Sequence, residues 1–279
     1  MEVQAQGFKK IETNKLTLDV FNASESSFGV ASVIVSGNTE AVLIDAQFTL
    51  GDAETVAQQI KRSGKNLSTI FISHGDPDFY FGLEIFKKHF PEVIIYAAPA
   101  TIAHIKATAQ KKLEVWGSRL GKAITSNVLL PRELQGNSIE LEDQKLEIVG
   151  LEEFPSKTFV WIPSAKAVLG GINVFGNDFH LWMADAQTPE VRKNWVTILD
   201  RITALQPAIV IPAHAGEGAA FDLASANHTK EYIQFYEEAL KTNKTSEALI
   251  STIKAKYPNL KFEAALQLGA KVNTGEMKW

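Results

Sequence analysis

The stretch from Ser68 to Gly82 reads Ser-Thr-Ile-Phe-Ile-Ser-His-Gly-Asp-Pro-Asp-Phe-Tyr-Phe-Gly. Its first six residues are mostly apolar or β-branched, which is typical of a buried strand. Ionisable side chains then stand at every second position, at His74, Asp76 and Asp78. Surface turns also use Gly, Asp and Pro, but ligand sites of open α/β folds lie where strands end. The density of ionisable groups therefore favours a functional site here.

The sequence before and after this stretch alternates between strand and helix patterns. Val30–Ser36 and Ala41–Ile44 are β-branched runs separated by Ser-Gly-Asn, which is typical of a hairpin. Gly51–Arg62 has apolar residues on one helical face. Further predicted elements are a helix from about Gly82 to His89, a strand at Val93–Tyr96 and a helix at Ala100–Leu120.

The middle of the chain contains short strands with tight connections, which predict an antiparallel sheet. These strands are Ser138–Leu141, Leu146–Val149, Thr158–Ile162 and Ala167–Leu169. A helix at Pro189–Leu205, a strand at Ala208–Ile211 and a helical tail from Phe221 to about Val272 follow. We therefore expect an α/β protein with two sheets covered by helices. It would form a single domain over residues 1–279, with a helical C-terminal extension at about 221–279.

Composition narrows the chemistry and the partners. The 279 residues include six histidines and no cysteine, which excludes disulfides, thiolate metal sites and cysteine nucleophiles. A formal net charge of −4 gives no reason to expect nucleic acid or an anionic membrane as partner. No run approaches the ~20 apolar residues that span a bilayer. We expect a cytoplasmic protein, or a periplasmic one if a signal peptide has been removed, that takes a small-molecule substrate or ligand.

Other strand ends and loops supply further candidates. Asp45 ends one predicted strand, and His214 ends another beside small residues. His180 and Asp185 flank Trp182, a pattern that suits either the mouth of a pocket or a packed aromatic loop, and the sequence slightly favours packing. Tyr80 is expected to add a phenol to that pocket. The histidines on predicted helices, which are expected to be surface or packing residues, are His89, His104 and His228.

The order of these motifs resembles the metallo-β-lactamase superfamily over residues from about Val30 to Gly216. The segments that carry the resemblance are Leu43-Ile44-Asp45, Ser73-His74 through Gly82, Val149-Gly150, Leu169-Gly170-Gly171 and Ile211-Pro212-Ala213-His214. The resemblance implies a four-layer αββα sandwich with a one- or two-metal site between the ends of its two sheets. It also implies hydrolysis of esters, lactones, thioesters, phosphoesters or β-lactams. Asp45 would then support the site from behind the metal ligands.

The chain departs from the superfamily's His-x-His-x-Asp-His motif. His74 and Asp78 match it, but Asp76 replaces the second histidine and Phe79 the last. Leu151 and Ile172 stand where the superfamily has a histidine and a bridging aspartate. His214 matches the final histidine. By resemblance, a single zinc or other divalent ion would bind His74, Asp76, Asp78 and His214, with Phe79, Leu151 and Ile172 as apolar lining.

We favour a metal-free site, because the replaced ligands are apolar. Two neighbouring carboxylates cannot both ionise easily, so one pKa should rise. The first functional hypothesis is acid–base hydrolysis of a small ester- or lactone-like substrate, with Asp78 or Asp76 as general base and His74 and His214 as proton donors or orienting groups. The alternatives are a non-catalytic protein that binds a small molecule or a partner, and a mononuclear metallohydrolase. The oligomeric state stays open.

Overall fold

The computed structural model describes residues 7–279. Contacts within the chain divide it into two compact units, the first ending at Ile172 and the second beginning at Asn173. Each unit is described by itself, and the single domain expected over residues 1–279 stays a prediction. Among the described residues, no helix combines the length and the apolar character needed to cross a bilayer.

The first unit is built on a sheet with the strand order β1-β2-β3-β4-β5-β6-β7. Its strands are β1 (Lys9–Glu12), β2 (Thr17–Asn22), β3 (Ala31–Ser36), β4 (Glu40–Ile44), β5 (Asn66–Ile72), β6 (Ile94–Ala97) and β7 (Arg132–Glu133). Pairing is antiparallel from β1 to β4 and parallel from β4 to β7. The change from antiparallel to parallel pairing at β4 follows from the segments that connect the strands. Short turns can join antiparallel strands, whereas parallel strands need a longer crossover. The hairpin predicted at residues 36–38 is confirmed.

The crossovers are helices α1 (Leu50–Ser63), α2 (Pro77–Tyr80), α3 (Leu83–His89) and α4 (Pro99–Leu120). The helix predicted at Gly51–Arg62 is confirmed as α1. Its start is capped by the Thr49 side chain, which accepts a hydrogen bond from the Asp52 N–H, and Gly64 ends it in the left-handed conformation. Its buried face consists of Ala53, Val56, Ala57 and Ile60.

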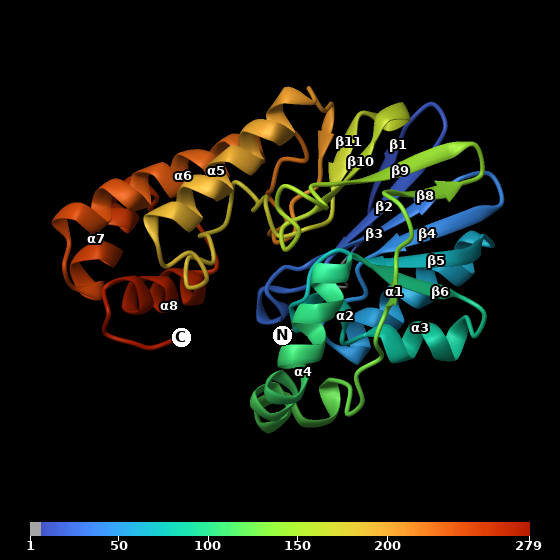
Figure 1. Cartoon of the computed structure of the whole chain (residues 1–279), viewed down its shortest axis with the longest axis horizontal. Coiled ribbons are helices and arrows are strands. Elements are labelled where there is room, and N and C mark those ends of the chain that lie inside the picture. Colours follow the sequence, from blue (N-terminus) through green and yellow to red (C-terminus); the bar gives the residue numbers. More distant parts are fainter. Residues whose placement is uncertain (1–6) are drawn as a thin grey trace. The chain divides into compact units, whose positions relative to one another are not determined.

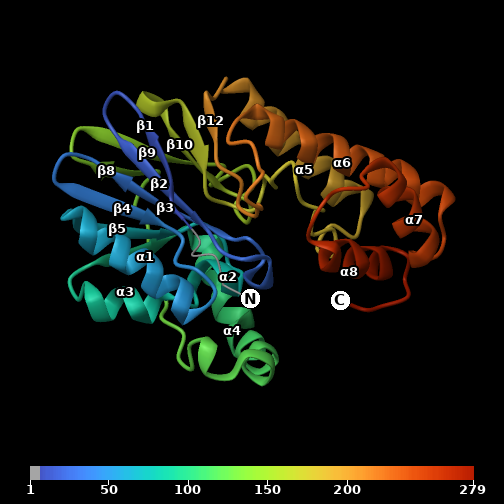
Figure 2. The ribbon, with the colours of Figure 1, turned by 180° about the vertical axis from the view of Figure 1, so that it is seen from behind.

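A second, antiparallel sheet lies on the other side of the first sheet from α1 and α3 (Figure 1 and, from behind, Figure 2). Its strands in the first unit are β8 (Ser138–Leu141), β9 (Gln144–Val149), β10 (Phe159–Ile162) and β11 (Ala167–Leu169), paired in that order. The sequence prediction of short antiparallel strands is therefore confirmed. The first unit thus contains a helix layer followed by two sheet layers, as expected for an α/β sandwich.

The second unit is mainly helical. It contains α5 (Pro189–Ala204), β12 (Ile209–Val210), α6 (Leu223–Thr242), α7 (Ser246–Lys256) and α8 (Glu263–Asn273). The buried guanidinium of Arg192 in α5 donates to the Ala186 carbonyl (2.6 Å) and to Asn273 in α8 (3.1 Å), and it pairs with Glu237 in α6. These bonds connect α5 with α6, with α8 and with the loop before α5. The expected helical tail is confirmed, and it is interrupted between α6 and α7, where the Thr245 side chain caps the start of α7.

The two hairpins β3–β4 and β8–β9 are joined by the carboxylate of Glu142. Its oxygens accept the backbone N–H groups of Asn38 (3.0 Å), Thr39 (2.7 Å) and Glu40 (3.1 Å). Gly37 permits this approach, because a Cβ atom there would lie 2.6 Å from the Glu142 carboxyl carbon. These backbone N–H groups hold the pKa of Glu142 down at about 2.

We predict that Glu142→Gln lowers the free energy of unfolding near neutral pH. A pKa lowered from 4.5 to about 2 stabilises the fold above its ordinary value, and this contribution is lost as the pH falls towards about 2. The deficit of the variant should therefore shrink over that acidic range in urea denaturation. Glu140→Gln, which removes an exposed carboxylate 3.7 Å from Lys145, is the control and should behave like wild type. A Glu142→Gln deficit that persists unchanged down to about pH 2 would contradict this assignment.

Candidate functional site

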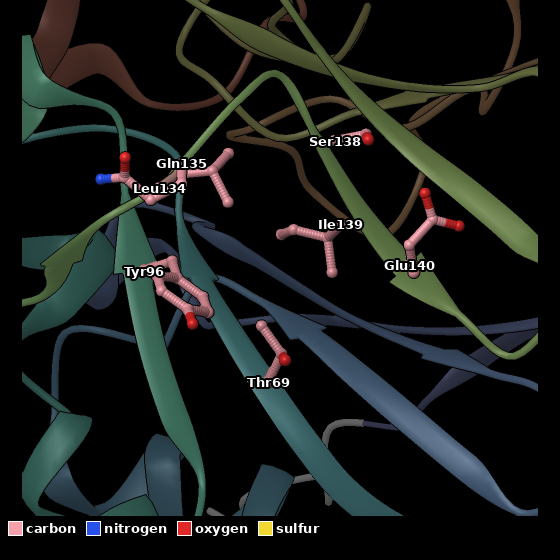
Figure 3. Close-up of a pocket in the computed structure, with 7 residues that line it drawn as sticks. All are labelled: Thr69, Tyr96, Leu134, Gln135, Ser138, Ile139 and Glu140. Atoms are coloured by element: carbon pink, nitrogen blue, oxygen red, sulfur yellow. The ribbon is translucent and has the colours of Figure 1, made fainter.

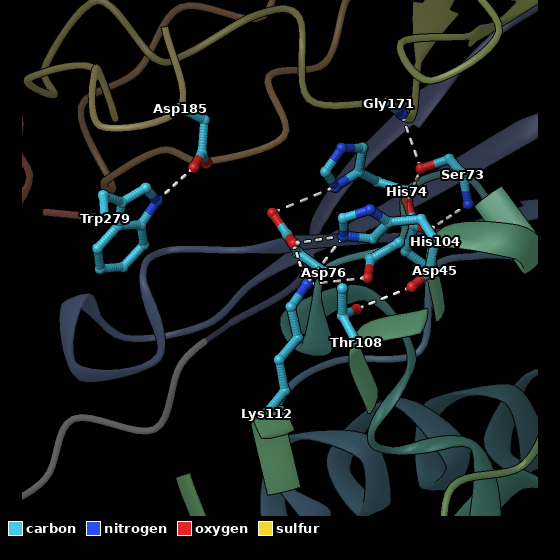
Figure 4. A network of polar contacts seen from close by, with 11 residues as sticks. Asp45, Ser73, His74, Asp76, His104, Thr108, Lys112, Gly171, Asp185 and Trp279 are labelled. Carbon is cyan, nitrogen blue, oxygen red and sulfur yellow. Dashed lines mark hydrogen bonds and ion pairs between the residues drawn. The ribbon is translucent and has the colours of Figure 1, made fainter. Parts of the chain in front are cut away.

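The ends of β4 and β5 and the turn after β11 are tied together by Asp45. Its Oδ1 accepts the Ser73 N–H (2.8 Å), and its Oδ2 lies 2.5 Å from Ser73 Oγ, which donates to it. Ser73 Oγ in turn accepts the N–H of Gly171 (2.7 Å). Burial raises the pKa of Asp45 to about 7, although the bonds from Ser73 act in the opposite direction. Asp45 therefore holds the loop that begins at Ser73 in place (Figure 4).

The loop after Ser73 leads into the short helix α2, with Pro77 at its start. His74 and Asp76 lie close together, with His74 Nδ1 3.5 Å from Asp76 Oδ2, and both side chains are partly exposed. Asp78 is buried in α2, so the acids at alternate positions do not share one environment. Phe79 is also buried, and its ring meets the His74 ring edge-on at a centroid distance of 5.2 Å.

Helix α4 brings two further polar groups to this loop. Lys112 Nζ lies 2.5 Å from Asp76 Oδ1, 3.3 Å from the Gly75 carbonyl oxygen and 3.1 Å from His104 Nε2. His104 Nε2 is 3.7 Å from the same carboxylate oxygen of Asp76. Figure 4 shows the side chains of His74, His104 and Lys112 arranged around Asp76. We name Gly75, Asp76, His104 and Lys112 the Lys112 cluster.

His104, expected to be a surface or packing residue, is about half exposed, packs against Gly75 and also lies beside Asp76. His104 lies about 30 residues after the loop in the chain, and the long helix α4 returns it to the loop. The sequence offered one indirect signal for this contact. Gly75 separates His74 from Asp76, and a Cβ atom at Gly75 would lie 2.6 Å from the His104 ring. Lys112 carried no signal, because its spacing from the loop follows only from the path of α4.

The pKa values of the two acids Asp76 and Asp78 are shifted in opposite directions. Burial opposes the charge of Asp76, but His74, His104 and the Lys112 ammonium together hold its pKa below the usual range. Burial, reinforced by the charge on Asp76, raises the pKa of Asp78 well above its ordinary value. Burial lowers the pKa of His74 to about 4 against the attraction of Asp76, so this imidazole is neutral at neutral pH. Burial and both acids raise the pKa of Tyr80.

The remaining predicted site residues of the first unit are Tyr80, Leu151 and Ile172, which were expected to line the pocket. Tyr80 and Ile172 are buried, and Leu151 is half-buried in the turn after β9. Their assignment as pocket lining stays a prediction. One hollow in this unit has a volume of about 230 Å³ and lies among β5, β6 and β8 (Figure 3). It is lined by Thr69, Tyr96, Leu134, Gln135, Ser138, Ile139 and Glu140, none of which was predicted as a site residue.

His214, His180 and Asp185 belong to the second unit. The buried His214 ring stacks on Phe175 at a centroid distance of 5.0 Å. His180 is fully buried, its Nδ1 lies 3.1 Å from the Tyr232 hydroxyl, and burial lowers its pKa to about 4. Asp185 Oδ1 accepts the indole N–H of Trp279 at 2.6 Å. Their roles in a site with His74 stay predictions.

The donor set does not suit the metal ion that the resemblance implies. Within residues 7–279, no group of three or more His, Asp or Glu side chains is arranged to hold a metal ion. A catalytic zinc site usually supplies three protein ligands. In this loop Asp76 is instead neutralised by the ammonium of Lys112. The ring of Phe79, which stands at the position of the superfamily's last motif histidine, packs against His74. We therefore derive no chemical step through a metal ion.

We predict a pH-dependent difference in stability between wild type and Asp45→Asn. Because the folded-state pKa of about 7 lies above 3.8, the folded protein retains a proton that the unfolded chain releases. The stabilisation from Asp45 is complete below its ordinary pKa and is lost as the pH rises through about 7. Wild type should thus lose stability relative to Asp45→Asn across this range in urea denaturation. Asparagine tolerates the positive φ of 63° at this position and still accepts the Ser73 N–H. A stability difference that does not vary with pH would contradict the assignment.

Three comparisons place the chain among known proteins. The family model of the metallo-β-lactamase superfamily matches residues 27–214. No curated protein sequence gives a significant match. A crystal structure of DIM-1 metallo-β-lactamase superposes with a TM-score of 0.56 at 19% sequence identity, covering 82% of this chain and 97% of that one. A metallo-β-lactamase from Pontibacter korlensis superposes with a TM-score of 0.55 at 18% identity, covering 81% of this chain and 99% of that one.

At such identities the solved structures show the shared fold, an α/β sandwich that here carries a helical C-terminus. The family model covers more than half of the chain and includes the segments that carry the motifs. The chain belongs to the metallo-β-lactamase superfamily.

Proposed function

We propose that this chain catalyses metal-independent acid–base hydrolysis of a small ester or lactone. The proposal rests on side chains of one loop whose pKa values are shifted in opposite directions. Burial raises the pKa of Asp78, whereas His74, His104 and Lys112 hold the pKa of Asp76 below its usual range. Burial lowers the pKa of His74 to about 4, so this imidazole is neutral at neutral pH. Paired titratable groups whose environments push their pKa values apart are typical of acid–base sites.

The roles follow from these states. Neutral His74 accepts a proton from a water molecule, whose oxygen attacks the ester or lactone carbonyl carbon. Asp76 orients the imidazole, since its Oδ2 lies 3.5 Å from Nδ1. Asp78 donates its proton to the alkoxide that leaves when the carbon–oxygen bond breaks. This assigns Asp78 as an acid, whereas the sequence suggested a general base. The involvement of His214 stays a prediction.

The burial of α2 favours a second candidate, a non-catalytic binding protein. Phe79, Tyr80 and Phe81 are each only 1% exposed, and Asp78 is 7% exposed. A protonated acid enclosed in this way needs movement of the loop before it reaches a substrate. The same loop with a fixed conformation would instead present only the partly exposed His74 and Asp76 to a ligand.

The test is a screen of small esters and lactones with chelator-treated protein. We expect wild-type turnover to persist in the presence of chelator, and Asp78→Asn and His74→Gln each to lower kcat/KM by about 100-fold or more. Asp143→Asn is the matched control, because it removes an exposed acid that pairs with Lys15 at 3.4 Å. Its rates should equal those of wild type.

Three outcomes would contradict catalysis by these residues. If no compound is turned over, or if Asp78→Asn retains wild-type rates while folded, the binding-protein candidate is favoured. If chelation removes the activity and zinc restores it, the metal-independent mechanism is wrong.

A further inference from the structure

The ammonium group of Lys112 is surrounded by polar atoms. It lies within 3.3 Å of a carboxylate oxygen, a peptide carbonyl oxygen and an imidazole nitrogen, from Asp76, Gly75 and His104 respectively. The Asp76 and Gly75 oxygens accept two of the three ammonium protons, and His104 Nε2 lies at hydrogen-bond distance from the ammonium nitrogen. An exposed surface ion pair seldom has this arrangement, because its ammonium is otherwise hydrated by water.

These polar atoms are also ligands for a divalent cation. Carboxylate oxygen and imidazole nitrogen bind zinc at about 2.0–2.2 Å. Around Lys112 Nζ the Asp76 oxygen lies at 2.5 Å and the His104 nitrogen at 3.1 Å. A shift of about 1 Å or less would thus bring either side chain to metal-binding distance. His74 Nδ1 lies 3.5 Å from the second oxygen of Asp76 and is a further nitrogen beside the same carboxylate.

The loop is shaped for this arrangement. The missing side chain at Gly75 leaves room for the His104 ring, since a Cβ atom there would lie 2.6 Å from His104 Cδ2. The His104 side chain is 48% exposed, so the position is reachable from solvent. The Lys112 side chain is only 21% exposed and the Asp76 side chain 26%, which limits the water that competes for the ammonium.

The charge of Lys112 also decides what else can bind. The ammonium neutralises Asp76 and occupies the point where these polar atoms converge. A divalent cation entering the same place would meet a positive charge at close range and would find the carboxylate already paired. The Lys112 ammonium and a divalent cation would therefore compete for the same carboxylate.

We propose that Lys112 is a resident cation that takes the place of a metal ion in this loop, and that its removal uncovers a divalent-cation site formed by Asp76, His104 and the Gly75 carbonyl. This ligand set differs from the one that the superfamily resemblance implies, because His104 and Gly75 are not part of it. The inference does not depend on whether the chain is a hydrolase.

The test measures zinc binding to the full chain by isothermal titration calorimetry after chelator dialysis. Lys112→Met keeps most of the side-chain length without the charge. We expect it to bind one Zn²⁺ at least about tenfold more tightly than wild type does, because the competing charge is gone. With Co²⁺ in place of Zn²⁺, the variant should show a visible absorption band typical of nitrogen and oxygen coordination. Wild type should not show this band.

Two controls make the result specific. Lys111→Met removes the neighbouring exposed lysine and should bind zinc as weakly as wild type. Lys112→Met combined with His104→Ala should lose the gain, because the imidazole ligand is absent. Circular dichroism verifies folding, and Lys112→Gln replaces Lys112→Met if the latter does not fold.

The proposal is overturned if folded Lys112→Met or Lys112→Gln binds Zn²⁺ no more tightly than wild type. It is also overturned if Lys111→Met gains the same affinity, since that would reflect net charge alone. If Lys112→Met combined with His104→Ala still binds Zn²⁺ more tightly than wild type, the metal ion binds elsewhere. This result would also reject the proposed ligand set.

Discussion

The contact between Lys112 and Asp76 is the interaction on which the chemistry of the loop after β5 depends. A buried or half-buried carboxylate needs compensation by a cation or by hydrogen bonds. Here an ammonium from α4 supplies that compensation, at 2.5 Å. Burial, reinforced by the negative charge of Asp76, raises the pKa of the nearby acid Asp78. The difference between the two acids thus follows from the burial of Asp78 and from the groups around Asp76, to which α4 contributes Lys112 and His104.

Two other carboxylates of the first unit, those of Asp45 and Glu142, are also surrounded by hydrogen-bond donors. Asp45 accepts both donor groups of Ser73 and so joins the ends of β4 and β5. Glu142 accepts a run of backbone N–H groups from the β3–β4 hairpin. In both places a single acidic side chain links strands that are distant in sequence. The site loop therefore starts from a strand end that is already fixed.

The predicted elements that proved correct are those with strong local periodicity. The helix α1 shows an apolar face and caps at both ends, and the strands of the second sheet are short apolar runs separated by turns. The strands β1 and β2 were not predicted. The four residues of β1 are mostly exposed and give no apolar alternation, so only pairing with β2 identifies them. The short helix α2 was not predicted either, because Pro77 is compatible with a turn as well as with the first turn of a helix.

For the site, residue types and their spacing predicted the superfamily and the position of the loop at a strand end. These features are local, because each depends on residue types at fixed spacing. Only the tertiary structure decided which cation meets Asp76, since α4 carries His104 and Lys112 back to the loop. The tertiary structure also sets the opposite pKa shifts of Asp76 and Asp78, because these depend on burial and neighbouring charge rather than on residue identity.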